Sequence, residues 1–369
     1  MNPDRLARAQ SATKAAGLDA LLITPGASLR YLTGYDAIPL ERLTCLIVPA
    51  EGAVSLVAPA LEVAAAEASP LGAWNVPIAG WAETDDPFAL VARMLPQRER
   101  LGLDDQMPAA KVLHLRAAMP DAEQRLASEV LRGLRMVKSS DEIKALRQAA
   151  EAIDRVHEQI ADWLQVGRTE REVGEDISEA ILAEGHVRVD FVIVGSGPNG
   201  ASPHHELSDR RIERSEPVVV DIGGTMPSGY CSDSTRNYCV GAPPDDYLAY
   251  YAPLVEAHAA AVAQVRPGVT AESVDAAARD ELERAGFGKQ FIHRTGHDIG
   301  LETHEDPYIV TGNNELLQPG MAFSVEPGVY LPGRHGARIE DIVVVTETGA
   351  DSLNKRPREL EILDPSFSS

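Results

Sequence analysis

The pattern of apolar residues changes near Leu131, and this change divides the chain into two regions. Before it, short helical and strand-like stretches alternate, whereas after it a pair of long helical stretches followed by strands occurs twice. A chain of 369 residues also exceeds the roughly 100–200 residues of one ordinary domain. We therefore expect an α/β domain over residues 1–132, followed by an α+β domain over residues 133–369.

The N-terminal region has the signals of a small α/β domain. Residues 4–16 have helical periodicity and are followed by Gly17, the residue type that most often ends a helix. Only one of the ten histidines, His114, falls in this region. We therefore expect the chemistry of the protein elsewhere. The predicted strands cover residues 20–24, 43–48, 54–57 and 101–104, with a hairpin turn at Glu51-Gly52.

The C-terminal region is predicted to contain four long helices. Ser140 is expected to cap the first of them, since Asp141 and Glu142 follow in the first turn. The second helix is expected to end at Gly185. The helices begin near residues 140, 170, 247 and 271, and the predicted strands include residues 191–194, 217–220 and 236–240.

A glycine-rich segment, residues 195–200, fits the G-x-G-x-x-G pattern of dinucleotide-binding proteins. That motif requires a helix to begin at the loop, so that its backbone amides can hold a pyrophosphate. Here Pro198 lies inside the loop, Pro203 follows it, and the next strong element is a strand. We interpret the segment as a turn between strands.

Charge and cysteine content exclude several classes of function. The chain has 56 acidic and 34 basic residues, a formal charge of −22, and such a surface repels nucleic acids and anionic lipid heads. No apolar run approaches the ~18 residues of a membrane span, and the first residues lack a secretion signal. Three cysteines (Cys45, Cys231 and Cys239) are too few for a disulfide framework. We expect a cytoplasmic protein that binds neither nucleic acid nor membranes.

Two aspartates lie at the ends of a predicted hairpin. Asp221 follows the apolar segment 218–220, and Asp233 precedes the next strand. Both are equidistant from Pro227, so a hairpin centred there would place them opposite each other on one face. Carboxylates held that close repel each other unless a cation lies between them. The pair indicates a metal site more strongly than a surface acidic patch.

A second polar segment carries three histidines within twelve residues: His293, His297 and His304. Gly296 and Gly300 exclude the helical H-E-x-x-H zinc motif and indicate that the backbone closely approaches another group.

Two further segments place acids beside apolar strands. Glu326 ends one strand, and Arg338 and Glu340 share a face of the strand predicted over residues 337–345. An Arg beside a Glu is by itself also consistent with a buried ion pair. Taken together, the four segments supply four carboxylates and one imidazole, which suit a pair of divalent ions better than a closed structural zinc. The sequence therefore predicts a two-metal hydrolase.

With these motifs in this order, the chain resembles the pita-bread metallopeptidases, in particular their proline-specific branch: Xaa-Pro dipeptidase (prolidase) and aminopeptidase P. The resemblance covers nearly the whole chain, including Tyr31-Leu32-Thr33-Gly34-Tyr35 in the N-terminal region. It implies a creatinase-like α/β domain over residues 1–132 and an α+β pita-bread catalytic domain over residues 133–369. The implied activity is hydrolysis of the peptide bond that precedes proline.

The resemblance also implies a role for each motif residue. Asp221 would chelate one metal ion, Asp233 and Glu340 would bridge both ions, and His297 and Glu326 would bind the second. Glu326 would also act as the proton shuttle. The usual metal of the family is Mn²⁺, and Co²⁺ or Zn²⁺ can substitute.

Four further residues would serve the substrate. His204, rather than His205, would bind it, and His304 would contact the scissile region and stabilise the tetrahedral intermediate. Arg338 would orient one of the carboxylates of Glu340 or Asp233, and Tyr330 would line the pocket. Family members form homodimers through or near the N-terminal domain, so a homodimer is implied.

One spacing departs from the family pattern. Asp221 and Asp233 are twelve residues apart, one more than is usual, and we place the extra residue in the turn around residues 225–228. Cys231 would share a strand face with Asp233, either as a ligand or nucleophile or as a packing residue. No neighbouring histidine is present to activate the thiol, which favours packing.

The sequence leaves two activities open, which differ in the length of the peptide substrate. A dipeptidase must recognise the free carboxylate after proline, ideally with a basic clamp, for which Arg294, Arg334 and His335 are candidates. The compact length of the chain and the sequence of residues 229–236 resemble bacterial dipeptidases of this family. They favour an Xaa-Pro dipeptidase over an aminopeptidase P, which acts on longer peptides. The complete ligand set disfavours a creatinase or a peptide-binding pseudoenzyme, and the N-terminal region disfavours a methionine aminopeptidase.

Overall fold

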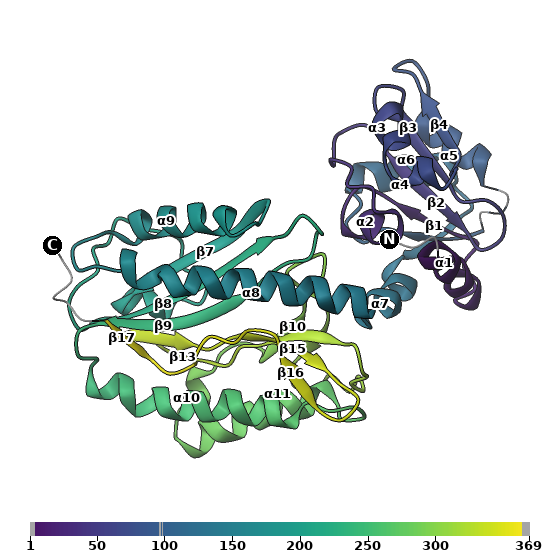
Figure 1. The fold of residues 1–369 in the computed structure, drawn as a ribbon. Coiled ribbons are helices and arrows are strands. Elements are labelled where there is room, and N and C mark those ends of the chain that lie inside the picture. Colours follow the sequence, from purple (N-terminus) through teal and green to yellow (C-terminus); the bar gives the residue numbers. More distant parts are fainter. Residues whose placement is uncertain (1–3, 96, 98, 364–369) are drawn as a thin grey trace. The chain divides into compact units, whose positions relative to one another are not determined.

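The computed structural model describes residues 4–95, 97 and 99–363 (Figure 1). The chain divides into two compact units, Met1–Arg135 and Met136–Ser369, whereas the boundary expected from the sequence lies three residues earlier, after residue 132. None of the helices in the described residues is both long enough and apolar enough to cross a membrane.

The N-terminal unit is an α/β domain around a mixed sheet of six described strands in the order β4-β3-β2-β1-β5-β6. The predicted hairpin is confirmed, because β2 and β3 pair antiparallel with Leu46 opposite Leu56. The predicted helix end is also confirmed, since Gly17 follows α1 with φ +69°. The strands are β1 (Ala20–Ile23), β2 (Cys45–Pro49), β3 (Ser55–Pro59), β4 (Ile78–Trp81), β5 (Arg100–Leu103) and β6 (Glu123–Leu126). The helices are α1 (Asp4–Ala15), α2 (Ala27–Thr33), α3 (Val63–Ala68), α4 (Pro70–Ala73), α5 (Pro87–Met94), α6 (Ala109–Ala118) and α7 (Ser128–Met136), the last residue of which belongs to the second unit.

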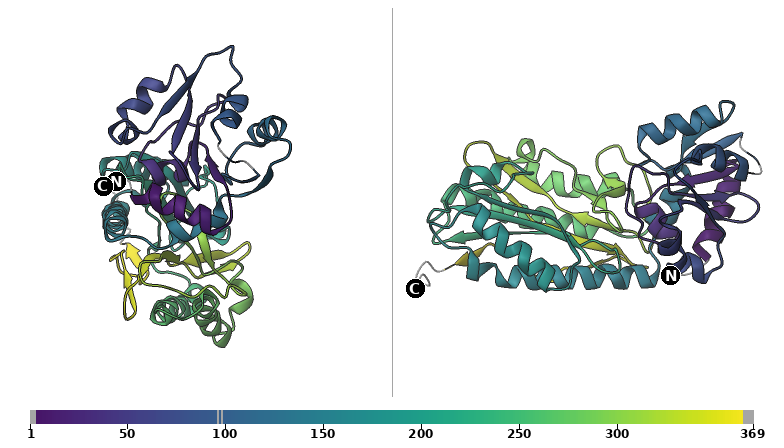
Figure 2. Two further views of the ribbon diagram at one scale, coloured as in Figure 1. Left: turned by 90° about the vertical axis from the view of Figure 1, so that its right-hand side faces the viewer. Right: turned by 90° about the horizontal axis from the view of Figure 1, so that it is seen from above.

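The second unit places strands between two pairs of helices, as the views in Figures 1 and 2 show. Apolar residues of the first pair pack on one group of strands, and those of the second pair pack on another. The helices are α8 (Ser140–Trp163), α9 (Glu170–Ala183), α10 (Asp245–Gln264) and α11 (Ala271–Arg284).

The first of these helices begins one residue earlier than expected. Ser139, not Ser140, is its N-cap, because Ser139 has extended backbone angles and its hydroxyl accepts from the amide of Glu142. The Glu142 carboxylate in turn accepts from the amide of Ser139, which completes a capping box.

The strands of the second unit form sheets in the orders β17-β9-β8-β7 and β11-β10-β12-β15-β16, together with the pair β13-β14. The first sheet comprises β7 (Arg188–Ser196), β8 (Pro217–Thr225), β9 (Ser234–Val240) and β17 (Glu361–Leu363). The others comprise β10 (Gly296–Asp298), β11 (Glu305–Ile309), β12 (Ala322–Val325), β13 (Gly328–Leu331), β14 (His335–Arg338), β15 (Asp341–Val345) and β16 (Ala350–Ser352). A short 3-10 helix, η2, covers Gly288–Gln290.

The glycine-rich segment forms no dinucleotide-binding loop. It begins in β7 and continues as a 3-10 helix, η1 (Gly197–Ala201), before the chain returns to a strand, β8. Gly200 approaches the backbone of Gly195 and of Gly336 so closely that there is little room for a side chain. The glycines therefore serve close packing of the backbone beside β14.

The prediction that the two aspartates lie directly opposite each other is wrong, because the centre of the hairpin is shifted by one residue. Asp221 lies opposite Thr235, and Ile222 lies opposite Ser234, so the hairpin is centred on Ser228 rather than Pro227. The shift arises because the turn closes over residues 226–229, with Gly229 at φ +92°. Asp233 is consequently a diagonal neighbour of Asp221 rather than its direct partner.

Candidate metal centre

Three buried side chains from distant parts of the sequence converge in the second unit. Asp233 lies just before β9, His297 lies in β10, and Glu340 lies between β14 and β15. One potential ligand atom from each lies within 4.8 Å of the others. All three residues are among those predicted to hold metal.

The strand predicted over residues 337–345 is interrupted, and the interruption places Glu340. β14 ends at Arg338 and β15 begins at Asp341. Glu340 instead forms an isolated antiparallel bridge with Thr235, and the Thr235 hydroxyl donates to the Glu340 carboxylate at 2.7 Å. This bridge joins the sheet that carries Asp221 to the segment that carries Glu340.

The other two predicted ligands lie at the same place. Glu326 Oε1 is 3.2 Å from His297 Nε2, and Asp233 Oδ2 is 3.7 Å from the same nitrogen. Asp221 contributes to the lining of the same cavity and is held by the guanidinium of Arg338. The structure therefore brings all five predicted ligand residues together.

The charges at this site repel one another in the absence of a cation. Burial, followed by the neighbouring charges of Glu340 and Asp221, raises the pKa of Asp233 well above its usual value. Burial and the charges of Glu326 and Asp221 likewise raise the pKa of Glu340. For Glu326, burial opposes ionisation, but the hydrogen bond and charge of His297 hold its pKa at about 2.

These residues fit a site for divalent cations. Asp221 Oδ1 is buried and has no hydrogen-bond partner in the described part of the chain. Such an orphaned carboxylate oxygen is costly unless another group satisfies it. Four carboxylates and one imidazole form a donor set that suits hard or borderline divalent ions.

The imidazole of His297 is oriented by the backbone around it. His297 Nδ1 donates to the carbonyl of Asp298 at 3.1 Å, which orients the ring so that Nε2 faces the carboxylates of Glu326 and Asp233. Ser324 Oγ accepts from the His297 amide at 3.0 Å and donates to Glu326 at 3.1 Å. A Cβ at Gly296 would overlap the carbonyl oxygen of Ser324, which confirms the close approach predicted for this glycine.

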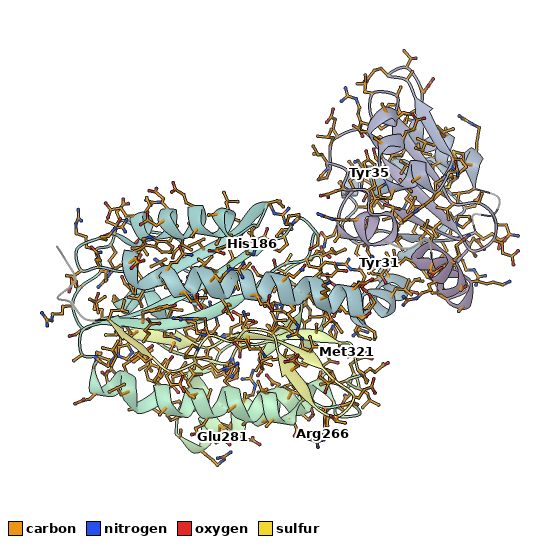
Figure 3. The ribbon with its side chains drawn as sticks, in the orientation of Figure 1. Tyr31, Tyr35, His186, Arg266, Glu281 and Met321 are labelled. Carbon is orange, nitrogen blue, oxygen red and sulfur yellow. The ribbon has the colours of Figure 1, made fainter. Side chains whose placement is uncertain are left out.

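Hydrogen bonds of Ser232 support the segment that carries Asp233. His186, which is labelled in Figure 3, has Nε2 at 2.9 Å from the hydroxyl of Ser232. The same hydroxyl accepts from the amide of Gly224 at 3.1 Å. Asp233 is thus attached to β8 through the residue that precedes it.

Two expected contacts differ from the structure. Arg338 holds Asp221 rather than Glu340 or Asp233, because it reaches Glu340 only through the hydroxyl of Thr235, at 3.1 Å. Tyr330 does not form part of the cavity lining. Its buried hydroxyl lies behind that lining, 2.9 Å from both Arg338 Nη1 and His293 Nε2.

A cavity of about 960 Å³ opens onto the candidate ligands. Its volume accommodates a small peptide. Its lining combines apolar residues, three of them from β7, with histidines and arginines. The lining residues include Phe191, Val192, Ile193, Leu207 and Val310, together with Arg171, His204, His205, His293, Arg294 and His304.

The two predicted substrate histidines both lie on this cavity. The centroid of the His304 ring is 4.0 Å from that of His297. Partial burial, followed by the neighbouring His297 and Arg294, lowers the pKa of His304 to about 4, so the ring is neutral near pH 7. His204 is exposed at the cavity, whereas the imidazole of His205 is engaged by Glu170 at 2.7 Å.

Three residues that support the site are not predicted from the sequence. Glu170, Thr235 and Ser324 each hold a site residue or its loop through hydrogen bonds. Glu170 is a fully buried acid at the start of α9, a position where the sequence indicates only an ordinary first-turn glutamate. His293 is one of the three histidines that the sequence places within twelve residues. Its spacing, however, indicates no specific role.

The structure favours packing for Cys231. The residue is buried in an apolar cluster with Ile299 and Ile342, and burial raises the pKa of its thiol to about 12. It does not contribute to the cavity lining. A thiol with so high a pKa is a poor nucleophile near neutral pH.

Comparisons with known proteins agree with this geometry. Residues 144–347 match metallopeptidase family M24, and residues 5–137 match the creatinase/prolidase N-terminal domain. This chain belongs to metallopeptidase family M24. The M24 match contains all five candidate ligands, which therefore lie in the catalytic domain of a metallopeptidase.

Individual relatives of this M24 chain resemble it over nearly their whole length. The "Probable dipeptidase PepE" of Mycobacterium tuberculosis is 54% identical over 360 residues, covering 97% of this chain and 96% of the relative. The Xaa-Pro dipeptidase of Lactobacillus helveticus is 35% identical over 371 residues, covering 98% and 99%. The crystal structure of dipeptidase PepE from Mycobacterium ulcerans has a TM-score of 0.94 at 54% identity and covers 98% of this chain and 97% of that one. The creatinase-like and pita-bread fold inferred from the sequence is thereby confirmed.

Proposed function

We propose that this M24 enzyme is an Xaa-Pro dipeptidase that uses two divalent cations. The observation that carries the proposal is the convergence of five candidate ligands in the lining of one cavity: Asp221, Asp233, His297, Glu326 and Glu340. The named activity of the Lactobacillus helveticus relative supports the Xaa-Pro preference. The oxygen-rich donor set supports Mn²⁺, with Co²⁺ or Zn²⁺ able to substitute.

The residues of the chain divide the work of hydrolysis. The bound ions would activate water and polarise the scissile carbonyl. Glu326 is ionised near neutral pH, so it can accept the proton that the attacking water loses and pass it to the proline nitrogen. His304 is neutral and can donate an N–H to the developing oxyanion. His204 faces the cavity and is proposed to bind substrate.

Arg338 and Tyr330 support the proposed metal ligands through their side-chain contacts. Arg338 holds Asp221 and is itself held by the Tyr330 hydroxyl. The assignment makes Arg338 a positioning residue for Asp221. Tyr330, in turn, positions Arg338 and His293 rather than touching substrate.

The test compares Ala-Pro with Ala-Pro-Ala after the protein has been stripped with chelator and reloaded with Mn²⁺. We expect Mn²⁺-dependent cleavage of Ala-Pro and little cleavage of the tripeptide. Faster cleavage of the tripeptide would instead identify an aminopeptidase P with the same site. If neither peptide is cleaved in a metal-dependent manner, the proposal is wrong.

Two further properties are part of the proposal. We infer a homodimer, which light scattering would detect as a mass near twice the 39.7 kDa of one chain. We also infer a cytoplasmic location, because Cys45, Cys231 and Cys239 are all buried free thiols. A monomeric mass at working concentration would contradict the first of these inferences.

A further inference from the structure

Three arginines line the cavity, and two of them are already paired with acids. Arg338 is bound to Asp221, and Arg171 Nε lies 2.9 Å from Asp209. Arg294 differs from both. Its guanidinium makes no ion pair or side-chain hydrogen bond to any residue that the structure describes, although the chain has 56 acidic residues.

The position of Arg294 is fixed by an aromatic ring. Its guanidinium carbon lies 4.1 Å from the centroid of the Tyr308 ring. Tyr308 is paired with His297 across β10 and β11. A guanidinium packed with one face on a ring keeps its N–H groups free at the edge, and these can bind a carboxylate through two parallel hydrogen bonds.

Arg294 is also close to the reacting region. It precedes the ligand His297 by three residues and contributes to lowering the pKa of His304. The other two candidates for a basic clamp lie elsewhere. Arg334 and His335 both contact Asp246, and neither lines the cavity.

We propose that Arg294, supported by Tyr308, binds the free carboxylate of the substrate's C-terminal proline. This inference rests on the proposed dipeptidase function and gives it a structural basis. In an Xaa-Pro dipeptide the carboxylate follows the scissile bond by one residue, so a single cation beside the metal site can recognise it. An extended peptide or a C-terminal amide has no charge at that point and leaves Arg294 unpaired.

The experiment uses Ala-Pro and its C-terminal amide with the Mn²⁺-loaded protein. The variant Arg294→Met keeps most of the side-chain length and removes the charge. We expect it to lower kcat/KM for Ala-Pro by about tenfold to a hundredfold, mainly through KM, as the loss of a charge-assisted hydrogen bond implies. The value for the amide should change by less than about threefold, since uncharged substrate makes no such pair.

Arg171→Met is the matched control, because Arg171 lines the same cavity but is already paired with Asp209. It should leave the acid-to-amide ratio of kcat/KM unchanged. Metal content and the melting temperature of both variants, compared with the wild type, report on folding.

The outcomes separate this inference from the proposed function. An unchanged acid-to-amide ratio in Arg294→Met, or an equal loss for both substrates, overturns the role of Arg294 while leaving the dipeptidase function in place. If the wild type cleaves neither substrate in a metal-dependent manner, both proposals are overturned.

Discussion

The imidazole of His205 lies 2.7 Å from the carboxylate of Glu170, which is fully buried. The same carboxylate accepts hydrogen bonds from the Ser196 amide and hydroxyl, from Asn199 and from Ser208. Burial opposes its ionisation, but these hydrogen bonds lower the pKa of Glu170 overall. Because every partner lies between residues 196 and 208, Glu170 anchors the segment that carries His204.

Replacing Glu170 by Gln should therefore loosen this segment without disturbing the metal ligands. The amide has the same size, but it loses the charge and places donors where the loop also presents donors. We expect a decrease in kcat/KM of roughly tenfold or more, with normal Mn²⁺ content. The matched control is Glu172→Gln, which affects an exposed capping glutamate on the same turn of α9. Normal kinetics in Glu170→Gln, or a loss of metal, would contradict the anchoring role.

Removing one carboxylate at the metal centre should not lower the thermal stability of the metal-free protein, but it should abolish the stabilisation that Mn²⁺ provides. In the metal-free protein, Asp233→Asn removes a carboxyl group whose pKa is raised by burial and by the neighbouring charges of Glu340 and Asp221, so the melting temperature should equal or exceed that of the wild type. With Mn²⁺, the wild type should gain stability by ligand linkage and the variant should not. Thermal unfolding with and without Mn²⁺, combined with metal analysis, checks both. Wild-type Mn²⁺ content in the variant would refute the ligand assignment.

A single methyl group at Gly296 should damage the site through the backbone. The added Cβ would overlap the carbonyl oxygen of Ser324 and force β10 away from β12, which displaces His297. We expect Gly296→Ala to destabilise the protein by about 1–3 kcal/mol and to weaken Mn²⁺ binding. Gly349→Ala is the control, since a methyl group added at that position would have no described atom within 4 Å. Denaturant unfolding and Mn²⁺ titration measure the two effects, and equal behaviour of the two variants would contradict the explanation.

Stability should fall in mild acid because of His157. Burial, followed by the charge of Arg236, lowers the pKa of His157 from 6.5 to about 3. Between these values the unfolded chain binds a proton that the folded chain does not, so stability is lost as the pH falls through this window. The slope from this residue approaches about 1.4 kcal/mol per pH unit near pH 5.

The variant His157→Gln isolates that contribution, because the other titrating groups are common to both proteins. Its unfolding free energy, measured by denaturant titration between pH 4 and pH 6.5, should depend less steeply on pH than that of the wild type. We also expect lower stability at pH 7, since the ring makes contacts of 2.9 Å with the Tyr238 hydroxyl and 3.2 Å with the Ser234 carbonyl. Parallel pH profiles would show that His157 does not titrate in this range.

Local patterns predicted the order of elements well, with errors at specific points. The N-cap of the first long helix is Ser139 rather than Ser140, and Glu142, three residues after Ser139, is the capping-box signal in the sequence that distinguishes the two serines. The hairpin register was misplaced because the turn length depends on Gly229, whose positive φ the spacing of the aspartates does not reveal. The strand expected over residues 337–345 was interrupted because Glu340 pairs with Thr235, which lies 105 residues earlier.

The sequence by itself determined the two-region organisation, which follows from the change in the pattern of apolar residues. It also determined the set of candidate ligands, because acids and histidines beside apolar strands can be recognised in the local sequence. The tertiary structure decided which charges are satisfied. It paired Arg338 with Asp221, left Arg294 against Tyr308, and surrounded Glu170 with donors from one loop. These contacts join residues far apart in the chain, and they depend on strand register and burial. The sequence around Arg338, Arg294 or Glu170 therefore does not reveal these partners.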